Sequence, residues 1–381
     1  MEIRFILLLF MTAASMILQT SCVSPKSEAD YLKSGNAYLL LKQYDKAIQD
    51  YSKSIELKPD AKVYYNRGDA YFKLEQYDKA IQDYAKAIDL KADYAEVYND
   101  RGCAYYNLKQ YTKAIQDYTK AIDLNADYAE VYYNRGNAHF LLKQYDKAIM
   151  DYSKAIELNP DDAKAYYNRG NAYYALKQYD KAIHDYPKVI ELKPDDADAY
   201  YGRAATYAEL KQYDKAVQDF SKAIELKSDY ANAYCARGIA YSELKLYDKA
   251  SLDFSKATEL KPDDGEIYSS ILETSIIAAK PEQFKQWLKR LEAAIPDGKL
   301  SKGDLIIKLY LVCLNKCVLN EPRTEIEQRL DALLKEKIEL NWSFDLTDEW
   351  LSDPKNGLTP EQVKYIRDLT ENVKATQKNL K

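Results

Sequence analysis

Few side chains in this sequence are of the types that carry out chemistry. His139 and His184 are the only histidines, and the thiols are five cysteines spread over 381 residues. A catalytic site needs a nucleophile with a base, a set of metal ligands, paired carboxylates in a cleft or a phosphate-binding loop. The sequence contains no HExxH, GxSxG, CxxC or Gly-rich phosphate motif. We therefore expect a protein that is not an enzyme and that uses no metal and no cofactor.

Two of the cysteines are close in sequence. Cys313 and Cys317 are four residues apart on a predicted helix, so they share one of its faces. A metal site would need two further ligands nearby, and we therefore expect two small buried apolar residues. An enzymatic site within residues 281–381 remains the alternative for this region.

Cys22 is the one residue whose surroundings predict a covalent modification. Met1–Arg4 carries one arginine, and Phe5–Leu18 is a largely apolar run. This run is shorter than the roughly 17–25 residues of a membrane-spanning helix, but it suits the core of a signal peptide. The sequence Leu18-Gln19-Thr20-Ser21-Cys22 resembles a bacterial lipobox, in which the chain is cut before the cysteine and the thiol is lipidated. Gln19 departs from the aliphatic residue usual in its place.

These features predict a signal peptide at residues 1–21, lipidation of Cys22 and a tether at 22–27. Buried acyl chains contribute roughly 0.8 kcal/mol of membrane affinity per CH₂. The protein would then be exported and anchored by lipid to a bacterial membrane, facing the periplasm or the cell exterior. A secretory signal that is simply cleaved and an uncleaved anchor are the alternatives.

The charge balance excludes one large class of partner. The chain has 55 Lys and Arg against 60 Asp and Glu, a net charge of -5. A protein whose main task is to neutralise phosphates needs a basic face. We therefore expect no nucleic-acid partner.

A period of 34 residues organises most of the chain. Small residues mark it at Gly68, Gly102, Gly136, Gly170, Ala204 and Gly238, and an earlier copy carries Gly35. This period defines seven repeats, at residues 28–60, 61–94, 95–128, 129–162, 163–196, 197–230 and 231–264.

Each repeat is predicted to form two amphipathic helices. In the fourth repeat, apolar and small residues recur at helical spacing over 131–140 and again over 145–156, and Lys143-Gln144 makes the turn between them. Gly136 and Ala148 are the small residues where the helices cross, and a side chain at Gly136 would hold the two backbones apart. Pro160 closes the repeat, since proline cannot continue a helix. No strand pattern occurs, so the predicted fold class is all-α.

This pattern resembles the tetratricopeptide repeat family. The family signature corresponds to Tyr132, Arg135-Gly136, His139, Ala148, Tyr152, Ala155 and Pro160, and the resemblance covers residues 28–264. It implies a right-handed α-solenoid of seven helix-turn-helix repeats that binds a protein or peptide without catalysis. Arginine stands where the family prefers leucine, which predicts a polar staple between neighbouring repeats at Arg67, Arg101, Arg135, Arg169, Arg203 and Arg237.

After Asp264 the period fails. Residues 265–280 are predicted to form a capping helix that covers the end of the stack. Residues 281–381 are predicted to form a smaller helical region of no recognised family, with helices at 282–295, 302–319 and 323–340. A last helix begins at 359–362, where Thr359 and Gln362 can form a capping box.

The resemblance also implies which side chains meet a ligand. In this family, fixed positions of the first helices line the inner, concave surface. On this sequence they correspond to Tyr65, Asp69, Phe72, Tyr106, Tyr133, Asn137, Phe140, Tyr167, Asn171, Tyr174 and Tyr201. Asparagine offers a donor and an acceptor to a peptide backbone, and aromatic rings supply rigid apolar area. Alternatively, some of these side chains only pack between repeats.

One partner known for the family is not expected. Some relatives hold the carboxylate at the end of a chaperone tail with a lysine and asparagine clamp. Here the lysine slot of that clamp is occupied by Leu32, Tyr65, Asn99, Tyr133, Tyr167, Tyr201 and Cys235.

The combined prediction is a non-catalytic protein–protein interaction scaffold of the bacterial cell envelope. It would bind a protein or extended peptide in the concave groove and support the assembly or secretion of an envelope complex. The alternative is an accessory lipoprotein of a solute transport system that binds a transporter binding protein or a small hydrophobic ligand. That alternative requires a closed apolar pocket between the solenoid and the carboxy-terminal helices.

Overall fold

The computed structural model describes residues 26–277, 281–319, 321–335, 345–352 and 357–378. All regular secondary structure within these ranges is helical, which confirms the all-α prediction. The chain divides into two compact parts, an amino-terminal part that ends at Ala172 and a carboxy-terminal part that begins at Tyr173.

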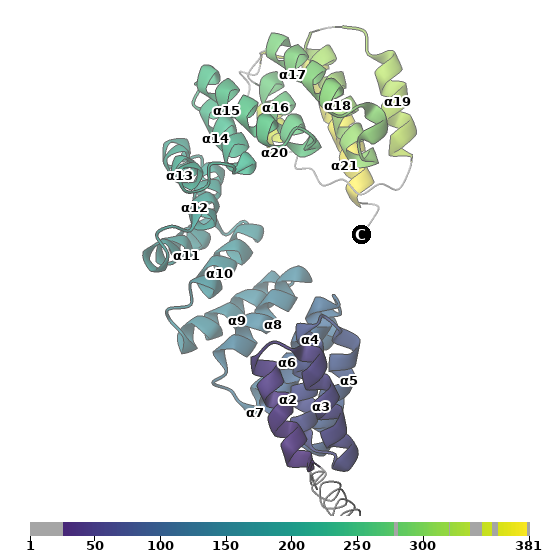
Figure 1. The fold of residues 1–381 in the computed structure, drawn as a ribbon. Coiled ribbons are helices and arrows are strands. Elements are labelled where there is room, and N and C mark those ends of the chain that lie inside the picture. Colours follow the sequence, from purple (N-terminus) through teal and green to yellow (C-terminus); the bar gives the residue numbers. More distant parts are fainter. Residues whose placement is uncertain (1–25, 278–280, 320, 336–344, 353–356, 379–381) are drawn as a thin grey trace, which may run out of the picture. The chain divides into compact units, whose positions relative to one another are not determined.

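The amino-terminal part is a series of helix pairs, one pair per repeat (Figure 1). The pairs are α2 (Glu28–Leu40) with α3 (Tyr44–Leu57), α4 (Ala61–Lys73) with α5 (Tyr77–Leu90), α6 (Ala95–Asn107) with α7 (Tyr111–Leu124), and α8 (Ala129–Leu141) with α9 (Tyr145–Leu158). The second helices α3, α5 and α7 also pack against the first helix of the next repeat. The first helix of repeat five, α10 (Ala163–Ala175), crosses the boundary between the two parts. This is the helix-turn-helix stacking predicted from the period.

The carboxy-terminal part begins with the rest of the repeats. They supply α11 (Tyr179–Leu192), α12 (Ala197–Glu209) with α13 (Tyr213–Leu226), and α14 (Ala231–Glu243) with α15 (Tyr247–Leu260). Pro187 lies inside α11, which keeps the 14-residue length of the other second helices, so the proline does not end it. The next helix, α16 (Gly265–Ile277), packs against α14 and α15 and also against the helices that follow.

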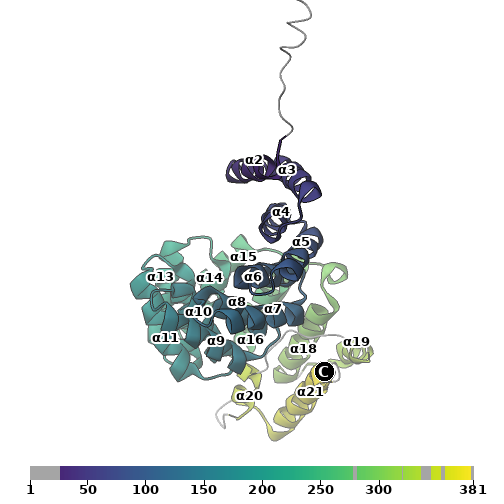
Figure 2. The ribbon, with the colours of Figure 1, turned by 90° about the horizontal axis from the view of Figure 1, so that it is seen from below.

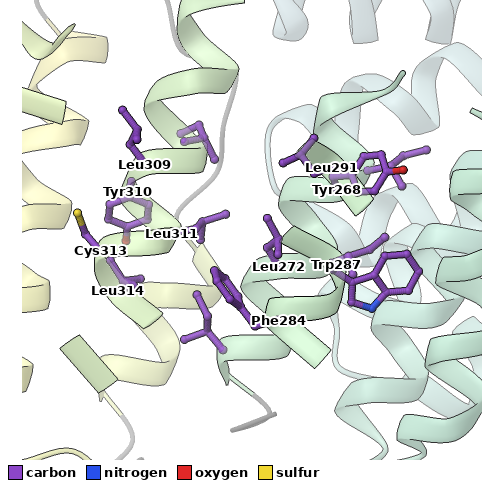
Figure 3. Packing of buried hydrophobic residues seen from close by; sticks show 14 of the residues in the cluster. Tyr268, Leu272, Phe284, Trp287, Leu291, Leu309, Tyr310, Leu311, Cys313 and Leu314 are labelled. Carbon is purple, nitrogen blue, oxygen red and sulfur yellow. The ribbon is translucent and has the colours of Figure 1, made fainter. Parts of the chain in front are cut away.

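The remaining helices share one hydrophobic core with the last repeat. They are α17 (Pro281–Ala294), the 3-10 turn η1 (Asp297–Lys299), α18 (Lys302–Val318), α19 (Thr324–Leu334), α20 (Asp345–Ser352) and α21 (Pro360–Lys378). Figure 3 shows Leu272 of α16, Phe284 of α17 and Leu311 of α18 in this core. The same cluster includes Phe254 of α15, whose ring meets Trp287 edge-on with 6.5 Å between centroids. The core of repeat seven therefore continues into the carboxy-terminal helices.

Predictions for this carboxy-terminal region have mixed outcomes. The capping box is present, because Thr359 N donates to Gln362 Oε1 at 2.9 Å and Gln362 N donates to Thr359 Oγ1 at 3.2 Å. Cys313 and Cys317 are buried on α18, as predicted. Helix α20 was not predicted, and the end of the helix predicted at 323–340 lies outside the described residues.

A single type of turn joins the two helices of every repeat. In repeat four, Gln144 N donates to His139 O at 2.9 Å and Lys143 N donates to Phe140 O at 2.8 Å. Lys143 has a φ of 57°, a left-handed conformation that favours glycine and costs other residues roughly 1–2 kcal/mol. The residues with this conformation are Lys42, Glu75, Lys109, Lys143, Lys177, Lys211 and Lys245. The turn is therefore maintained by its hydrogen bonds against the preference of the residue.

Gly136 makes room for an aromatic ring, which corrects the expectation that it lets two backbones approach. A Cβ atom added at Gly136 would lie 2.7 Å from Cε1 of Tyr152, closer than real contacts of this kind. The same relation holds for Gly35 with Tyr51, Gly68 with Tyr84, Gly102 with Tyr118 and Gly238 with Phe254. The glycine slot thus receives the buried ring of the second helix.

The predicted polar staple is present and has two components. Within repeat four, Arg135 Nε and Nη2 donate to the two carboxylate oxygens of Asp151, at 2.9 and 2.7 Å. Arg135 Nη1 donates to Thr119 Oγ1 of repeat three at 3.0 Å. The equivalent ion pairs are Arg67 with Asp83, Arg101 with Asp117, Arg203 with Asp219 and Arg237 with Asp253. The arginine therefore joins the two helices of its own repeat, and in Arg67, Arg135 and Arg237 it also bonds to the preceding repeat.

The bond to the preceding repeat needs a hydroxyl in one slot of the second helix. Other acceptors in this slot are Ser52, Ser153 and Ser221. Repeats two and five have Ala85 and Pro187 there, and neither side chain has a hydroxyl. The junction between repeats two and three and the junction between repeats five and six therefore lack this bond.

Candidate functional site

The predicted ligand-facing residues lie on first helices, and neighbouring first helices touch. Contacts join α2 with α4, α4 with α6 and α6 with α8 in the amino-terminal part (Figure 2). In the carboxy-terminal part, contacts join α12 with α14. The helix α4 carries Tyr65, Asp69 and Phe72, α6 carries Tyr106, α8 carries Tyr133, Asn137 and Phe140, α10 carries Tyr167, Asn171 and Tyr174, and α12 carries Tyr201. All eleven are partly exposed. The residues of the amino-terminal part, from Tyr65 to Asn171, define what we call the first-helix face.

Buried tyrosines of the second helices hold the polar side chains of this face. Tyr152 is 1% exposed, and its hydroxyl donates to Asn137 Oδ1 at 2.8 Å. Burial raises the pKa of Tyr152 well above its usual value, so the hydroxyl keeps its proton. The equivalent bonds run from Tyr51 to Asn36, from Tyr84 to Asp69 and from Tyr118 to Cys103. In each case the acceptor is the residue that follows the glycine slot.

An asparagine of the next repeat joins this bond. Asn168 Nδ2 donates to Asn137 Oδ1 at 2.9 Å and to Tyr133 Oη at 3.1 Å. The corresponding bonds run from Asn66 to Asn36 at 2.9 Å and from Asn134 to the sulfur of Cys103 at 3.7 Å. We call this series of second-helix tyrosine, first-helix polar residue and next-repeat asparagine the polar ladder. It fixes side chains of the face across repeat junctions.

The polar ladder leaves two donors on the face at repeat four. Asn137 Oδ1 and Tyr133 Oη act as acceptors within it, so the Asn137 Nδ2 group and the Tyr133 O–H remain as donors. Within the part of the chain that the structure describes, neither donor has a hydrogen-bond acceptor. A ligand that reaches this point must therefore present acceptors.

Carboxyl groups replace the amides where repeats two and three meet. Asp69 accepts from the Tyr84 hydroxyl at 2.7 Å, and Asp100, in the slot of Asn168, accepts from the Tyr65 hydroxyl at 2.8 Å. Burial raises the pKa of Asp69 to about 7, and the charge of Asp100 adds to this effect. Burial also raises the pKa of Asp100. This stretch of the face differs chemically from repeat four.

Aromatic residues near the end of the first helices pack on their own repeat. The ring of Phe140 meets Tyr145 edge-on with 5.2 Å between centroids. The same arrangement joins Phe72 with Tyr77, Tyr106 with Tyr111 and Tyr174 with Tyr179. These four predicted ligand-facing residues thus have a structural role, and only their remaining exposed area can meet a ligand.

The polar ladder does not extend through repeats six and seven. The slot after the glycine position holds Ala205 and Ile239 there, and the facing ring is Phe220 or Phe254. Tyr201 stacks on Tyr230 with 5.0 Å between centroids. Beside Tyr201 lies a hollow of about 190 Å³, lined by Cys235, Ile239 and Ile267 and also by the polar Asn232, Asp264, Glu266 and Ser270.

Sequence reasoning missed three members of the site. Tyr152 was singled out only as part of the family signature, and Asn168 and Asp100 were not singled out. A signal was present in the 34-residue slots, where Asn66, Asn134 and Asn168 recur and Asp100 replaces asparagine in repeat three. A second signal was the second-helix ring, which is tyrosine where the first-helix slot is polar and phenylalanine where that slot is apolar.

Other predicted features fall outside this face. The described residues contain no group of His, Cys, Asp and Glu arranged to hold a metal ion. None of the described helices has the length and apolar character needed to cross a membrane. The predicted signal peptide at 1–21, Cys22 and most of the tether at 22–27 lie outside the described residues.

Comparisons with known proteins agree with the repeat pattern. A family model for the TPR repeat matches residues 35–75, 68–109, 104–143 and 136–177, and a model for the tetratricopeptide repeat matches 163–196, 197–230 and 231–264. The comparison with curated proteins gives no match.

Several solved structures are similar to parts of this chain. The carboxy-terminal part of a TPR repeat-containing protein from Cytophaga hutchinsonii is 22% identical, with a TM-score of 0.55 over 63% of this chain and 99% of that one. The MamA protein is 31% identical, with a TM-score of 0.43 over 45% of this chain and 94% of that one. YrrB, described as a TPR protein with an unusual peptide-binding site, is 23% identical, with a TM-score of 0.44 over 48% of this chain and 95% of that one.

The polar ladder can be tested at Tyr152 and Asn137. Asn137→Ala should lower the free energy of unfolding by about 1–3 kcal/mol, because the buried Tyr152 hydroxyl loses its acceptor. Tyr152→Phe combined with Asn137→Ala should cost less than the sum of the single changes, because repeat six pairs Phe220 with Ala205. Urea unfolding of the two single variants and the double variant measures this coupling. Strictly additive losses would show that the two side chains do not act together.

Proposed function

The chain belongs to the tetratricopeptide repeat family, and we propose from this premise that its first-helix face binds an extended segment of a protein partner. The repeats make the protein a protein–protein interaction scaffold.

The donor pair at repeat four is the observation that supports the proposal. The Asn137 Nδ2 group and the Tyr133 hydroxyl are held by Tyr152 and Asn168, so little ordering remains to be done when a ligand arrives. An extended peptide carries carbonyl oxygens at intervals of roughly 3.3 Å that need donors. The exposed parts of Phe140 and Tyr106 offer apolar area to its side chains.

The same face does not suit a terminal carboxylate held by a clamp. The clamp requires a lysine, and the corresponding slots hold Tyr65, Asn99 and Tyr133 in repeats two to four. Asn99 is 2% exposed and donates to Asp100 at 3.1 Å. An internal stretch of a partner chain, which offers peptide carbonyls and no terminal charge, fits this face better.

We further propose that the protein acts in the bacterial cell envelope as a lipoprotein anchored through Cys22. This part of the proposal is supported by the apolar run at Phe5–Leu18 and the lipobox-like sequence before Cys22. A lipid anchor would keep the scaffold at a membrane, where it could support the assembly or secretion of an envelope complex. The solute-transport alternative requires a closed apolar pocket, and the hollow beside Tyr201 is lined in part by Asn232, Asp264 and Glu266, which argues against it.

The binding face can be tested by removing the two donors together. Tyr133→Phe with Asn137→Ala should reduce capture of the partner about tenfold or more, because two hydrogen bonds of roughly 0.5–1.5 kcal/mol each are lost. Quantitative pull-down from the producing cells measures the effect, with circular dichroism to show that the fold is kept. Tyr105→Phe is the matched control, since it removes a phenol hydroxyl outside the face and should leave capture unchanged. Equal capture by all three proteins would refute the assignment.

The lipid anchor can be tested at Cys22. Cys22→Ala should abolish incorporation of a labelled fatty acid and move the protein from the membrane fraction to the soluble fraction, because the acylated thiol is lost. Cys103→Ala serves as the control and should keep both properties. Labelling that persists in Cys22→Ala would show that the lipobox assignment is wrong.

A further inference from the structure

The junction between repeats two and three lacks the arginine–hydroxyl bond that the junctions on either side of it have. At the junctions on either side, the arginine of the later repeat donates to a hydroxyl of the earlier one, from Arg67 to Ser52 at 2.9 Å and from Arg135 to Thr119 at 3.0 Å. Arg101 faces Ala85, which offers no acceptor. Arg101 donates to Asp117 of its own repeat through Nε and Nη2, each at 2.7 Å.

The same junction also differs in the polar ladder. At the junction between repeats four and five, the two slots that face one another hold Asn137 and Asn168, joined at 2.9 Å. Between repeats two and three these slots hold Asp69 and Asp100. Two ionised carboxyl groups have no donor between them, so they cannot form the hydrogen bond that the two amides form. Their like charges repel each other.

The surroundings of the two carboxyl groups favour their protonated form. Tyr84 donates to Asp69 at 2.7 Å, and Tyr65 and Asn99 donate to the two oxygens of Asp100 at 2.8 and 3.1 Å, so both carboxyl groups belong to one buried network at the junction. Burial raises the pKa of Asp69 to about 7, and it raises the pKa of Asp100 as well. The positive charge of Lys73 opposes both pKa shifts. The other titratable groups around the pair are Tyr51, Tyr94, Cys103, Tyr118, Tyr128 and Glu130.

We infer that repeats two and three meet at a joint controlled by pH, which is tight while the Asp69–Asp100 pair carries a proton and loosens when both groups are ionised. The joint follows from contacts between α4, α5 and α6 and needs no ligand, although Tyr65 and Asp69 also lie on the first-helix face. It would let the amino-terminal repeats respond to acidity while the junctions beside them stay closed.

The direction of the effect follows from proton binding. Asp69 binds its proton more tightly in the folded protein than in an unfolded chain, where its pKa would be near 3.9. The stability that the proton gives to the junction is therefore complete below about pH 4 and is lost as pH rises through about 7. Above that range the junction is weak and no longer depends on this pair.

Hydrogen exchange in the full chain tests the inference. Protection factors of amides in α4 and α6, measured from pH 5 to pH 8, should fall by up to about tenfold per pH unit below pH 7 and then level off, as release of one proton predicts. Amides in α8 and α9, where the junction has asparagines, should change by less than about threefold over the same range. Protection in α4 and α6 that does not change with pH would overturn the inference.

Three variants test the carboxyl pair and the arginine bond of this junction separately. Asp100→Asn should remove the pH dependence in α4 and α6, because the new amide can donate to Asp69 as Asn168 donates to Asn137. Ala85→Ser should raise protection at every pH without changing the slope, because it restores the acceptor for Arg101. Asn137→Asp with Asn168→Asp should create a similar pH dependence at the junction between repeats four and five. An Asp100→Asn protein that keeps the full pH dependence would also overturn the inference.

Discussion

The ion pair between the first-helix arginine and the second-helix aspartate is the interaction on which the geometry of repeats two, three, four, six and seven depends. In repeat one, Ser34 takes the place of the arginine and donates to Asp50. The aspartates are nearly buried, with Asp83 and Asp151 each 5% exposed, and a buried carboxylate is tolerated only when it is paired. The planar guanidinium meets both oxygens at once, so the pair sets the rotation of one helix against the other as well as their distance. A leucine in this slot would add apolar contact but would not fix the relative rotation of the two helices.

The position of the first-helix face follows from that geometry. Once the two helices are set, the ring of the second-helix tyrosine enters the space above the glycine, and its hydroxyl reaches the next residue of the first helix. The asparagine of the following repeat then completes the bond. The side chains of the first-helix face are thus positioned by groups beneath them that no ligand touches. The donors at repeat four are those that this hydrogen-bond network does not use. Where the tyrosine becomes Phe220 or Phe254, the residue in front becomes apolar.

Much of the fold could be predicted from the sequence because each position of the 34-residue repeat can be compared across seven copies. The helix pairs, the staple arginines and the capping box at Thr359 all follow from residue type and spacing within one or two turns of helix. The role of Gly136 and the hydrogen-bond partners of Asn137 could not be predicted. They depend on which side chains meet across two helices or across a repeat junction. Helix α20 was missed because this short helix lies outside the repeats, where no slot could be compared. The exchange of asparagine for Asp100 was visible, but its meaning depends on Asp69 facing it.

The free energy of unfolding of Arg67→Leu tests the central claim most directly. This substitution places the residue usual for the family in the slot and leaves Asp83 buried without its partner. The account predicts a loss of about 3–5 kcal/mol in urea unfolding, with Arg67→Leu combined with Asp83→Ala recovering a large part of it. A loss below about 1 kcal/mol, the range of an exposed ion pair, would contradict the claim that this pair sets the geometry of the repeats.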